Sequence, residues 1–254
     1  MTGESEVCST TGLAVRPAAG QRSYRLAKPS YGVLNPPTRP LSSRADRSKW
    51  NRFDLPGQQT VYAASSLEGA YGELLGALKL PRTIAASDYL DDASDTDLYD
   101  LITQDWAQMG KQRPGTVDLR WIYAHRIYNV DLPIHGWFVE IEHARSITYL
   151  TQHIPVSLAD IGLTEITVSE TRSSDRHLTT ALAELLVRVQ IHASTAAHGI
   201  HYYSKHGTDW TCWAIWLHEH TFAALHTDTG SPVKPPATNP ALARVLDIYN
   251  LTTS

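Results

Sequence analysis

Apolar residues recur along this chain with the ~3.6-residue period of an α-helix in four stretches. The first follows Ser65 and Glu68, whose spacing is that of a capping box. Its apolar face consists of Leu67, Ala70, Tyr71, Leu74, Leu75 and Leu78. The second covers residues 96–109, with these side chains predicted to point inward: Leu98, Leu101, Ile102 and Met109.

The third helical stretch begins near Ser174 or Asp175, and Gly199 is its predicted stop. Its apolar stripe consists of Leu178, Leu182, Leu185, Leu186 and Val189. The fourth stretch is short and covers residues 241–251, where the amphipathic pattern predicts a C-terminal helix.

Four other stretches have the pattern of β-strands. Residues 60–64 are apolar and partly β-favouring, and residues 137–142 alternate apolar and acidic side chains after their first pair. Residues 200–203 and 211–217 are two more, and the second of these is apolar on both faces, as a covered central strand is. Strands and helices are mixed without regular βαβ repetition. The sequence therefore predicts an α+β (mixed α/β) fold, not a doubly wound sheet.

The polar and Pro-rich stretches predict how the chain is organised. Residues 1–21 are rich in Ser, Thr, Gly and Ala without an apolar period, which predicts a mobile tail. Residues 29–47 contain four prolines, so we expect an ordered loop there. Residues 231–240 resemble a connector to the C-terminal helix, so the expected catalytic domain covers residues 22–230.

Composition narrows the class of protein. The 254 residues are 42% apolar and 19% charged, which is an ordinary globular composition, and the net charge of −4 argues against a general nucleic-acid binder. Cys8 and Cys212 lie in very different surroundings, which indicates free thiols in a reducing compartment. The sequence has neither a signal peptide pattern nor a run of ~18 apolar residues. We therefore expect a cytoplasmic protein without a membrane partner.

Several standard catalytic signatures are missing from the sequence: GxGxxG, the Walker GxxxxGK[ST], GxSxG and CxxC. His218, Glu219, His220 and His226 leave a metal hydrolase as one alternative. Because no HExxH helix contains them, histidines at the surface or at a strand end are the commoner interpretation, and the prediction is that no metal is bound.

Five scattered residues are the remaining candidates for chemistry: Arg25, Arg52, Tyr62, Glu73 and Ser204. Taken singly, each has an ordinary structural interpretation. Glu73 lies more than about 100° from the centre of its helix's apolar stripe, which predicts an exposed or cleft-facing carboxylate.

Taken in order, the segments around these residues resemble the RES domain, a family of bacterial toxins named for an Arg, a Glu and a Ser. Its usual pattern is a YR pair, a GRFNPPG-like turn, an LYLA strand, an AL-x-E helix and a G-I-x-Y-P-S strand. The matching segments here are Tyr24-Arg25, residues 52–57 (RFDLPG), 61–65 (VYAAS), 70–73 (AYGE) and 199–204 (GIHYYS). The resemblance covers residues 22–220, with four departures. Trp50-Asn51 replaces the usual Gly-Gly, and Asp54 stands where Asn is usual. Tyr203 stands where Pro is usual, and residues 82–125 are longer than a compact member needs.

The resemblance implies a fold similar to ADP-ribosyltransferases, in which helices flank a mixed β-sheet core, and an enzyme that consumes NAD⁺. Glu73 would be catalytic, together with Arg25 and Ser204, because a carboxylate can stabilise a ribosyl cation or orient its nucleophile. Arg25 and Arg52 would bind the diphosphate, while Tyr62 and Ser204 would contact nicotinamide or ribose. NAD⁺ would be the substrate, with no separate cofactor and no metal.

What the resemblance implies is a NAD⁺ glycohydrolase or phosphorylase, the toxin of a toxin–antitoxin pair, with a protein antitoxin as partner. A protein ADP-ribosyltransferase and a non-catalytic RES-like binding module remain alternatives. A homodimer is expected only because symmetric dimers are the commonest assembly.

Overall fold

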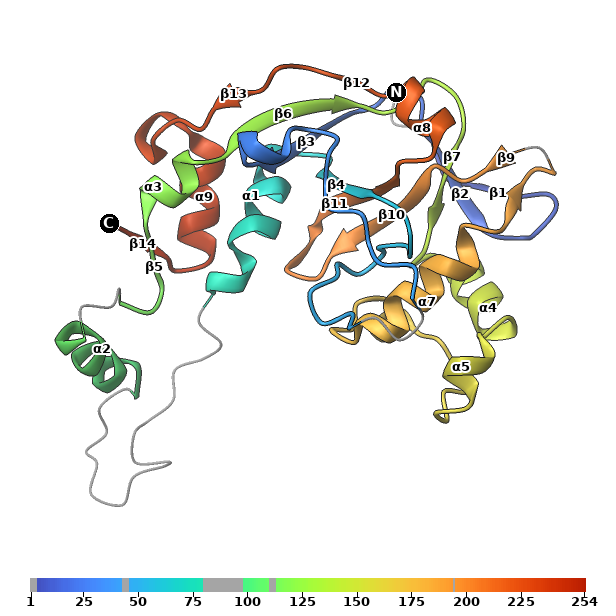
Figure 1. Ribbon diagram of the computed structural model, residues 1–254, viewed down its shortest axis with the longest axis horizontal. Coiled ribbons are helices and arrows are strands. Elements are labelled where there is room, and N and C mark those ends of the chain that lie inside the picture. The colour runs from blue at the N-terminus through green and yellow to red at the C-terminus, as the bar shows by residue number, and fades with distance from the viewer. Residues whose placement is uncertain (1–3, 43–45, 80–97, 110–112, 194) are drawn as a thin grey trace.

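The computed structural model describes residues 4–42, 46–79, 98–109, 113–193 and 195–254, and in this part the chain forms a mixed sheet flanked by helices (Figure 1). The predicted α+β class is confirmed. The main sheet has ten strands, nine of them in the order β1-β2-β7-β10-β11-β4-β3-β6-β12, and β13 also pairs with β6. All its pairs are antiparallel except β7 with β10.

The strands of this sheet have the following bounds: β1 Glu6–Val7, β2 Ala14–Pro17, β3 Arg22–Ala27, β4 Thr60–Ala64, β6 Arg126–Asp131, β7 Trp137–Glu140, β10 Gly199–Ser204, β11 Gly207–Trp216, β12 His226–Thr227 and β13 Ser231–Pro232. Two small pairs lie outside it: β5 Thr116–Val117 with β14 Thr252–Thr253, and β8 Gln190–Ile191 with β9 Thr195–Ala196.

The helices have the following bounds: α1 Leu67–Leu75, α2 Leu98–Gln108, α3 Leu119–Tyr123, α4 Ala144–Gln152, α5 Val156–Ala159, α6 Val168–Thr171, α7 Arg176–Leu186, α8 Glu219–Ala224 and α9 Pro240–Ile248. Three short 3₁₀ turns are η1 Pro29–Tyr31, η2 Gly76–Leu78 and η4 Pro236–Thr238.

Strand β11 is buried on both faces, as its apolar pattern predicts. Cys212, Ala214 and Trp216 point into the largest core cluster, which also holds residues of α4, α5 and α7. Trp213 and Ile215 point the other way, into a cluster on the opposite face. This alternation follows from the two-residue repeat of a strand, and it makes β11 the central strand between β10 and β4.

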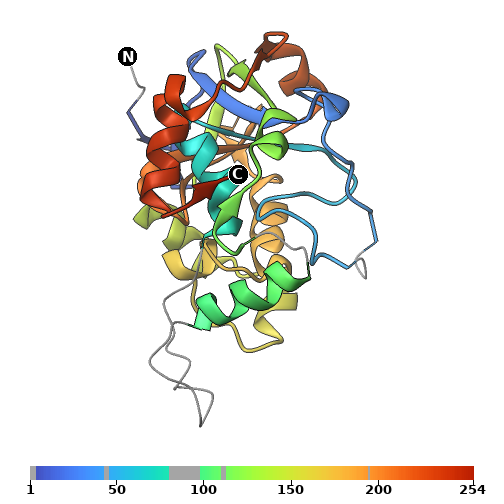
Figure 2. The ribbon, with the colours of Figure 1, turned by 90° about the vertical axis from the view of Figure 1, so that its left-hand side faces the viewer.

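Helices α1 and α9 pack side by side at one end of the sheet (Figure 2). Their contact is a third core cluster, in which Tyr71 and Leu75 of α1 meet Leu242 and Val245 of α9. The Asn239 side chain accepts a hydrogen bond from Leu242 N–H at the start of α9 and donates one to the Tyr71 hydroxyl. The predicted C-terminal helix therefore packs against α1 and shares this core cluster with it.

The predicted mobile tail is wrong for the described part of residues 1–21. Strands β1 and β2 extend the main sheet beside β7, and Leu13 and Val15 are fully buried in the largest core cluster. Local composition misleads here because the residues that cover this segment come from the distant strand β7 and helix α4.

Three further sequence predictions need correction. The cap of α1 is Ser66, which accepts from Gly69 N–H, and not Ser65. Helix α7 begins at its predicted Asp175 cap but ends at Leu186, well before Gly199, because the chain turns into the β8–β9 pair. The predicted inward Met109 is 64% exposed, beyond the end of α2. The segment 82–125 lies only partly within the described residues.

Candidate active site

A cavity of about 350 Å³ opens between the sheet and helix α1, and its size is within the range of small-molecule sites. The sheet side is formed by β3, β4, β10 and β11, and the other side by α1, the 51–52 loop, the start of α7 and the turn after β10. Of the five residues singled out in the sequence, four line it: Arg25, Arg52, Tyr62 and Glu73. The fold thus brings four positions from separate segments to one cavity.

Arg25 occupies a place where the sheet opens. Strand β3 pairs with β6 along residues 22–27, but it pairs with β4 only through Tyr24 and Ala64. The Arg25 guanidinium lies in this opening, and its Nη1 donates to the Tyr62 carbonyl oxygen at 3.1 Å. Its Nε is buried without a hydrogen-bond partner. Burial lowers the pKa of Arg25 to about 10, because the charged form has lost its water.

Arg52 is 6% exposed, and its guanidinium lies over the rings of Phe53 and Tyr202, with centroid distances of 5.4 and 4.5 Å. It also hydrogen-bonds the Tyr202 hydroxyl, while its Nη1 is buried without a partner. Within the described residues, no carboxylate forms an ion pair with Arg25 or with Arg52. Buried charges are usually paired, so the cavity presents two guanidinium groups suited to an anion.

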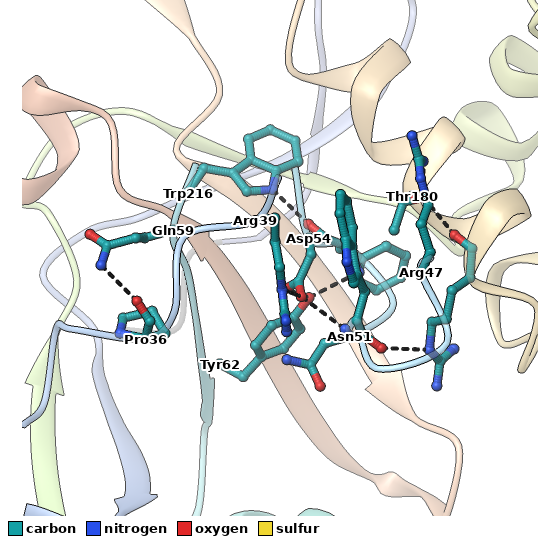
Figure 3. Close-up of polar contacts among 12 residues, drawn as sticks. Pro36, Arg39, Arg47, Asn51, Asp54, Gln59, Tyr62, Thr180 and Trp216 are labelled. Carbon is teal, nitrogen blue, oxygen red and sulfur yellow. Dashed lines mark hydrogen bonds and ion pairs between the residues drawn. The ribbon is translucent and has the colours of Figure 1, made fainter. Parts of the chain in front are cut away.

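The loop that carries Arg52 is fixed by hydrogen bonds on each side (Figure 3). Asp54 is 2% exposed, and its Oδ2 accepts from Arg39 Nε at 2.6 Å and from Asn51 N–H at 2.8 Å. The Tyr62 hydroxyl donates to Asp54 Oδ1 at 2.9 Å and accepts from Phe53 N–H at 2.9 Å. The Tyr62 ring thus lines the cavity while its hydroxyl is committed to the loop.

Glu73 reaches the cavity because helix α1 packs closely on β11. A Cβ added at Gly72 would lie 2.3 Å from the Trp210 ring, so glycine allows this approach. The Glu73 side chain is half-buried, and its Oε1 lies 4.0 Å from the Cys212 sulfur. No described lysine, arginine or histidine lies within ion-pair distance of Glu73. Apart from this weak hydrogen bond from the Cys212 thiol, its carboxylate forms no ion pair within the described residues.

Cys212 and Tyr202 form the floor beneath Glu73. The Cys212 thiol is 1% exposed, and burial followed by the nearby Glu73 charge raises its pKa. Burial likewise raises the pKa of Tyr202, with contributions from Cys212 and Glu73. Both groups are therefore neutral at physiological pH, and Glu73 is the carboxylate among the described residues that line the cavity.

Ser204 is the predicted site residue that does not line the cavity. It is fully buried at the end of β10, and its hydroxyl accepts from His206 N–H at 3.1 Å. The strand register shifts between Tyr203 and Ser204. The turn shaped in this way places Lys205 and His206 in the cavity wall.

Sequence reasoning missed several cavity residues, among them Arg176, Tyr202, Lys205 and His206. Arg176 follows the Asp175 cap of α7, and its pKa is lowered by burial and by the neighbouring charge of Arg52. Its Nε donates to the Trp50 carbonyl oxygen at 3.0 Å, beside the Arg52 loop. A cation directly after a helix cap was the available signal, although such residues are usually solvated.

The histidine cluster of the sequence lies elsewhere in the fold. His218 and His220 stack with ring centroids 5.5 Å apart, and His220 lies 5.4 Å from His198. Among the described residues, no group of three or more His, Cys, Asp or Glu side chains could hold a metal ion. Over the same part of the chain, no helix combines the length and apolar character that crossing a membrane requires.

Comparisons with known proteins add little to this geometry. No family model matches the sequence, and no curated protein matches it either. Among solved structures, a chain of "Crystal structure of the M.tuberculosis MbcT-MbcA toxin-antitoxin complex." is similar, with a TM-score of 0.40 and 10% identity over 90% of this chain and 89% of that chain. The resemblance to the RES family therefore rests on the short motifs quoted above.

Proposed function

We propose that this protein cleaves NAD⁺ at the bond between nicotinamide and ribose. The observation that carries the proposal is one cavity lined both by two guanidinium groups that have buried nitrogens without a partner and by the Glu73 carboxylate, which forms no ion pair within the described residues. A ligand that complements it is anionic in one part and cationic in another. NAD⁺ has a negative diphosphate and a positively charged nicotinamide ring.

The diphosphate would lie against Arg25 and Arg52. Guanidinium groups bind phosphate oxygens through paired N–H donors, and both arginines have buried nitrogens without a partner. These guanidinium groups have already lost water in the free protein, so binding an anion does not require their desolvation again. An arriving anion therefore gains from them more than it would from solvated surface arginines.

Glu73 would act at the ribose. When the bond to nicotinamide breaks, its electron pair moves to the ring nitrogen and the ring departs neutral, which leaves positive charge on the ribose. A nearby carboxylate stabilises that charge and can take the proton of an attacking water. The Tyr62 and Tyr202 rings offer apolar faces for nicotinamide or ribose in the same cavity.

The acceptor can be water or phosphate, and a protein acceptor would make the same chemistry an ADP-ribosyltransferase. Depletion of NAD⁺ is harmful to a cell, so a protein with this activity needs control. We therefore include in the proposal a toxin role, with a protein antitoxin that covers the cavity.

The test is to incubate the purified full-length protein with NAD⁺, with and without phosphate, and to follow nicotinamide release. We expect release by the wild type and a fall of about 10² or more for Glu73→Gln. Glu68→Gln is the matched control, because Glu68 is on the same helix and its partner is Arg244, away from the cavity. NAD⁺ labelled in its adenylate part, added with lysate, distinguishes transfer to protein from hydrolysis. Absence of both release and transfer, or equal activity of Glu73→Gln, would refute the proposal.

A further inference from the structure

The Asp54 network consists of Asp54 with the three groups that donate to it: Arg39, Asn51 N–H and Tyr62. We propose that this network positions Arg52 for the diphosphate, so that Asp54 controls substrate affinity without touching the substrate. The inference rests on the proposed function, because it assigns Arg52 to an anionic ligand. Asp54 is absent from the cavity lining, whereas Arg52 and Tyr62 are part of it.

The backbone on each side of Arg52 is held by partners from other elements, while its side chain lies over the Tyr202 ring and hydrogen-bonds the Tyr202 hydroxyl. Before it, Arg176 Nε donates to the Trp50 carbonyl oxygen at 3.0 Å. After it, Phe53 N–H donates to the Tyr62 hydroxyl at 2.9 Å, and the Phe53 carbonyl accepts from Trp216 Nε1 at 3.1 Å. These partners come from α7, β4 and β11, and Figure 3 shows Tyr62 and Trp216 reaching the loop from the sheet. The loop is therefore pinned to the sheet, and one side chain projects from it.

Both oxygens of Asp54 are occupied, which makes the carboxylate hard to replace. Oδ1 accepts from Tyr62, and Oδ2 accepts from both Arg39 and Asn51 N–H. An asparagine at this position would present an NH₂ group to one of these sets. If the NH₂ group faced Arg39 and Asn51 N–H, donors would meet donors. If it faced Tyr62, the Tyr62 hydroxyl could no longer donate its hydrogen to this side chain. Asparagine therefore breaks part of the network although its shape is nearly the same.

Arg39 connects the network to the rest of the long loop before β4. Its N–H donates to the Gln58 carbonyl at 3.1 Å, and its carbonyl accepts from Gly57 N–H at 2.9 Å. The ion pair with Asp54 is well covered, with side-chain exposures of 17% and 2%. Ion pairs shielded from water are weakened little by salt and hold a defined geometry. Arg39→Gln is thus a second way to loosen the same loop from its far side.

The experiment measures affinity for ADP-ribose, which carries the diphosphate but lacks the nicotinamide bond, by calorimetry on the full chain. We expect Asp54→Asn and Arg39→Gln each to weaken binding by about tenfold, equivalent to ~1.4 kcal/mol. The decisive step is a double-mutant cycle with Arg52→Ala. If Asp54 acts through Arg52, then Asp54→Asn has no further effect once Arg52 is alanine. Glu142→Gln is the matched control, because it disrupts another covered arginine pair, with Arg172, outside the cavity lining.

Two results would overturn the positioning role: wild-type affinity of Asp54→Asn, or an equal loss from Asp54→Asn with and without Arg52. Hydrogen exchange over residues 50–54 provides a readout that needs no ligand. We expect faster exchange there in Asp54→Asn and unchanged exchange in α9. If the wild type does not bind ADP-ribose, the proposed function fails. In that case, hydrogen exchange at residues 50–54 still tests whether Asp54 holds the loop. Equal exchange rates in Asp54→Asn and the wild type would refute the positioning role of Asp54.

Discussion

Replacing Arg25 with methionine should stabilise the ligand-free protein and remove its affinity for anions. Burial lowers the pKa of Arg25 well below its usual value, to about 10. At ~1.36 kcal/mol per pKa unit, the charged form carries a penalty of about 3 kcal/mol in the folded state. The hydrogen bond from Nη1 to the Tyr62 carbonyl oxygen returns about 1 kcal/mol. Methionine has a similar length without the charge, so the net gain should be about 1–2 kcal/mol in unfolding free energy.

The sign of this effect at neutral pH follows from proton linkage. A cation whose pKa is lower in the folded state binds its proton more weakly there than in the unfolded chain. The penalty on Arg25 is therefore fully present below pH ~10, and it is relieved only as the pH rises from about 10 toward the usual pKa of an arginine. The substitution removes the same penalty at pH 7, where the rest of the protein is undisturbed.

Urea denaturation at pH 7 measures the gain, and Arg22→Met is the control. Arg22 lies on the same strand, but its side chain is 59% exposed and pairs with Asp131 at the surface, so its loss should change stability little. Saturating ADP-ribose should then raise the midpoint of the wild type and leave that of Arg25→Met unchanged. A loss of stability in Arg25→Met, or equal stabilisation of both proteins by ADP-ribose, would refute the reasoning.

Two further predictions concern the framework around the cavity. Gly72→Ala should cost about 1–3 kcal/mol of stability, because its Cβ would lie 2.3 Å from the Trp210 ring. Thermal denaturation checks it against Gly207→Ala, whose Cβ meets nothing closer than 3.7 Å, and equal melting of the two variants would contradict it. Glu140 is buried, which raises its pKa, but hydrogen bonds led by that from His201 outweigh this and hold the pKa at about 2. The contribution of the ionised Glu140 to stability is present above pH ~4.5 and is lost as the pH falls toward 2. Glu140→Gln should therefore flatten the pH dependence of the unfolding free energy in that window. An unchanged slope would contradict this prediction.

The sequence predicted those elements whose side chains alternate or repeat clearly. Strands β4, β10 and β11 were found because their own residues fill the core on one or both faces. Strand β3 was missed, although it carries Arg25, because its buried and half-buried positions include Ser23 and Arg25. Its strand character depends on pairing with β6, about a hundred residues later. Local periodicity contains no information about such a partner.

Four of the five residues singled out in the sequence line one cavity, but the sequence did not predict what surrounds them. Helical periodicity indicated that Glu73 faces away from the core of its own helix, but not that the sheet and the Arg52 loop stand opposite it. Ser204 was expected to contact the substrate, whereas its hydroxyl shapes the turn that carries His206. Arg176 was missed because it reaches the cavity only through the packing of α7 against the Arg52 loop. Long-range packing decided each of these differences.

The two carboxylates near the cavity differ because of the donors that surround them. Asp54 accepts hydrogen bonds from Arg39, Asn51 N–H and the Tyr62 hydroxyl, so both of its oxygens are occupied within the protein. Glu73 has no cation within ion-pair distance among the described residues and stays available. If Glu73 were paired with cations as Asp54 is, the cavity would keep its arginines but would have no free carboxylate to stabilise positive charge on a ribose in the proposed reaction. Under the proposed function, the unpaired state of Arg25 and Arg52 keeps the site open to anions, because pairing them with acids would stabilise the fold and close the site.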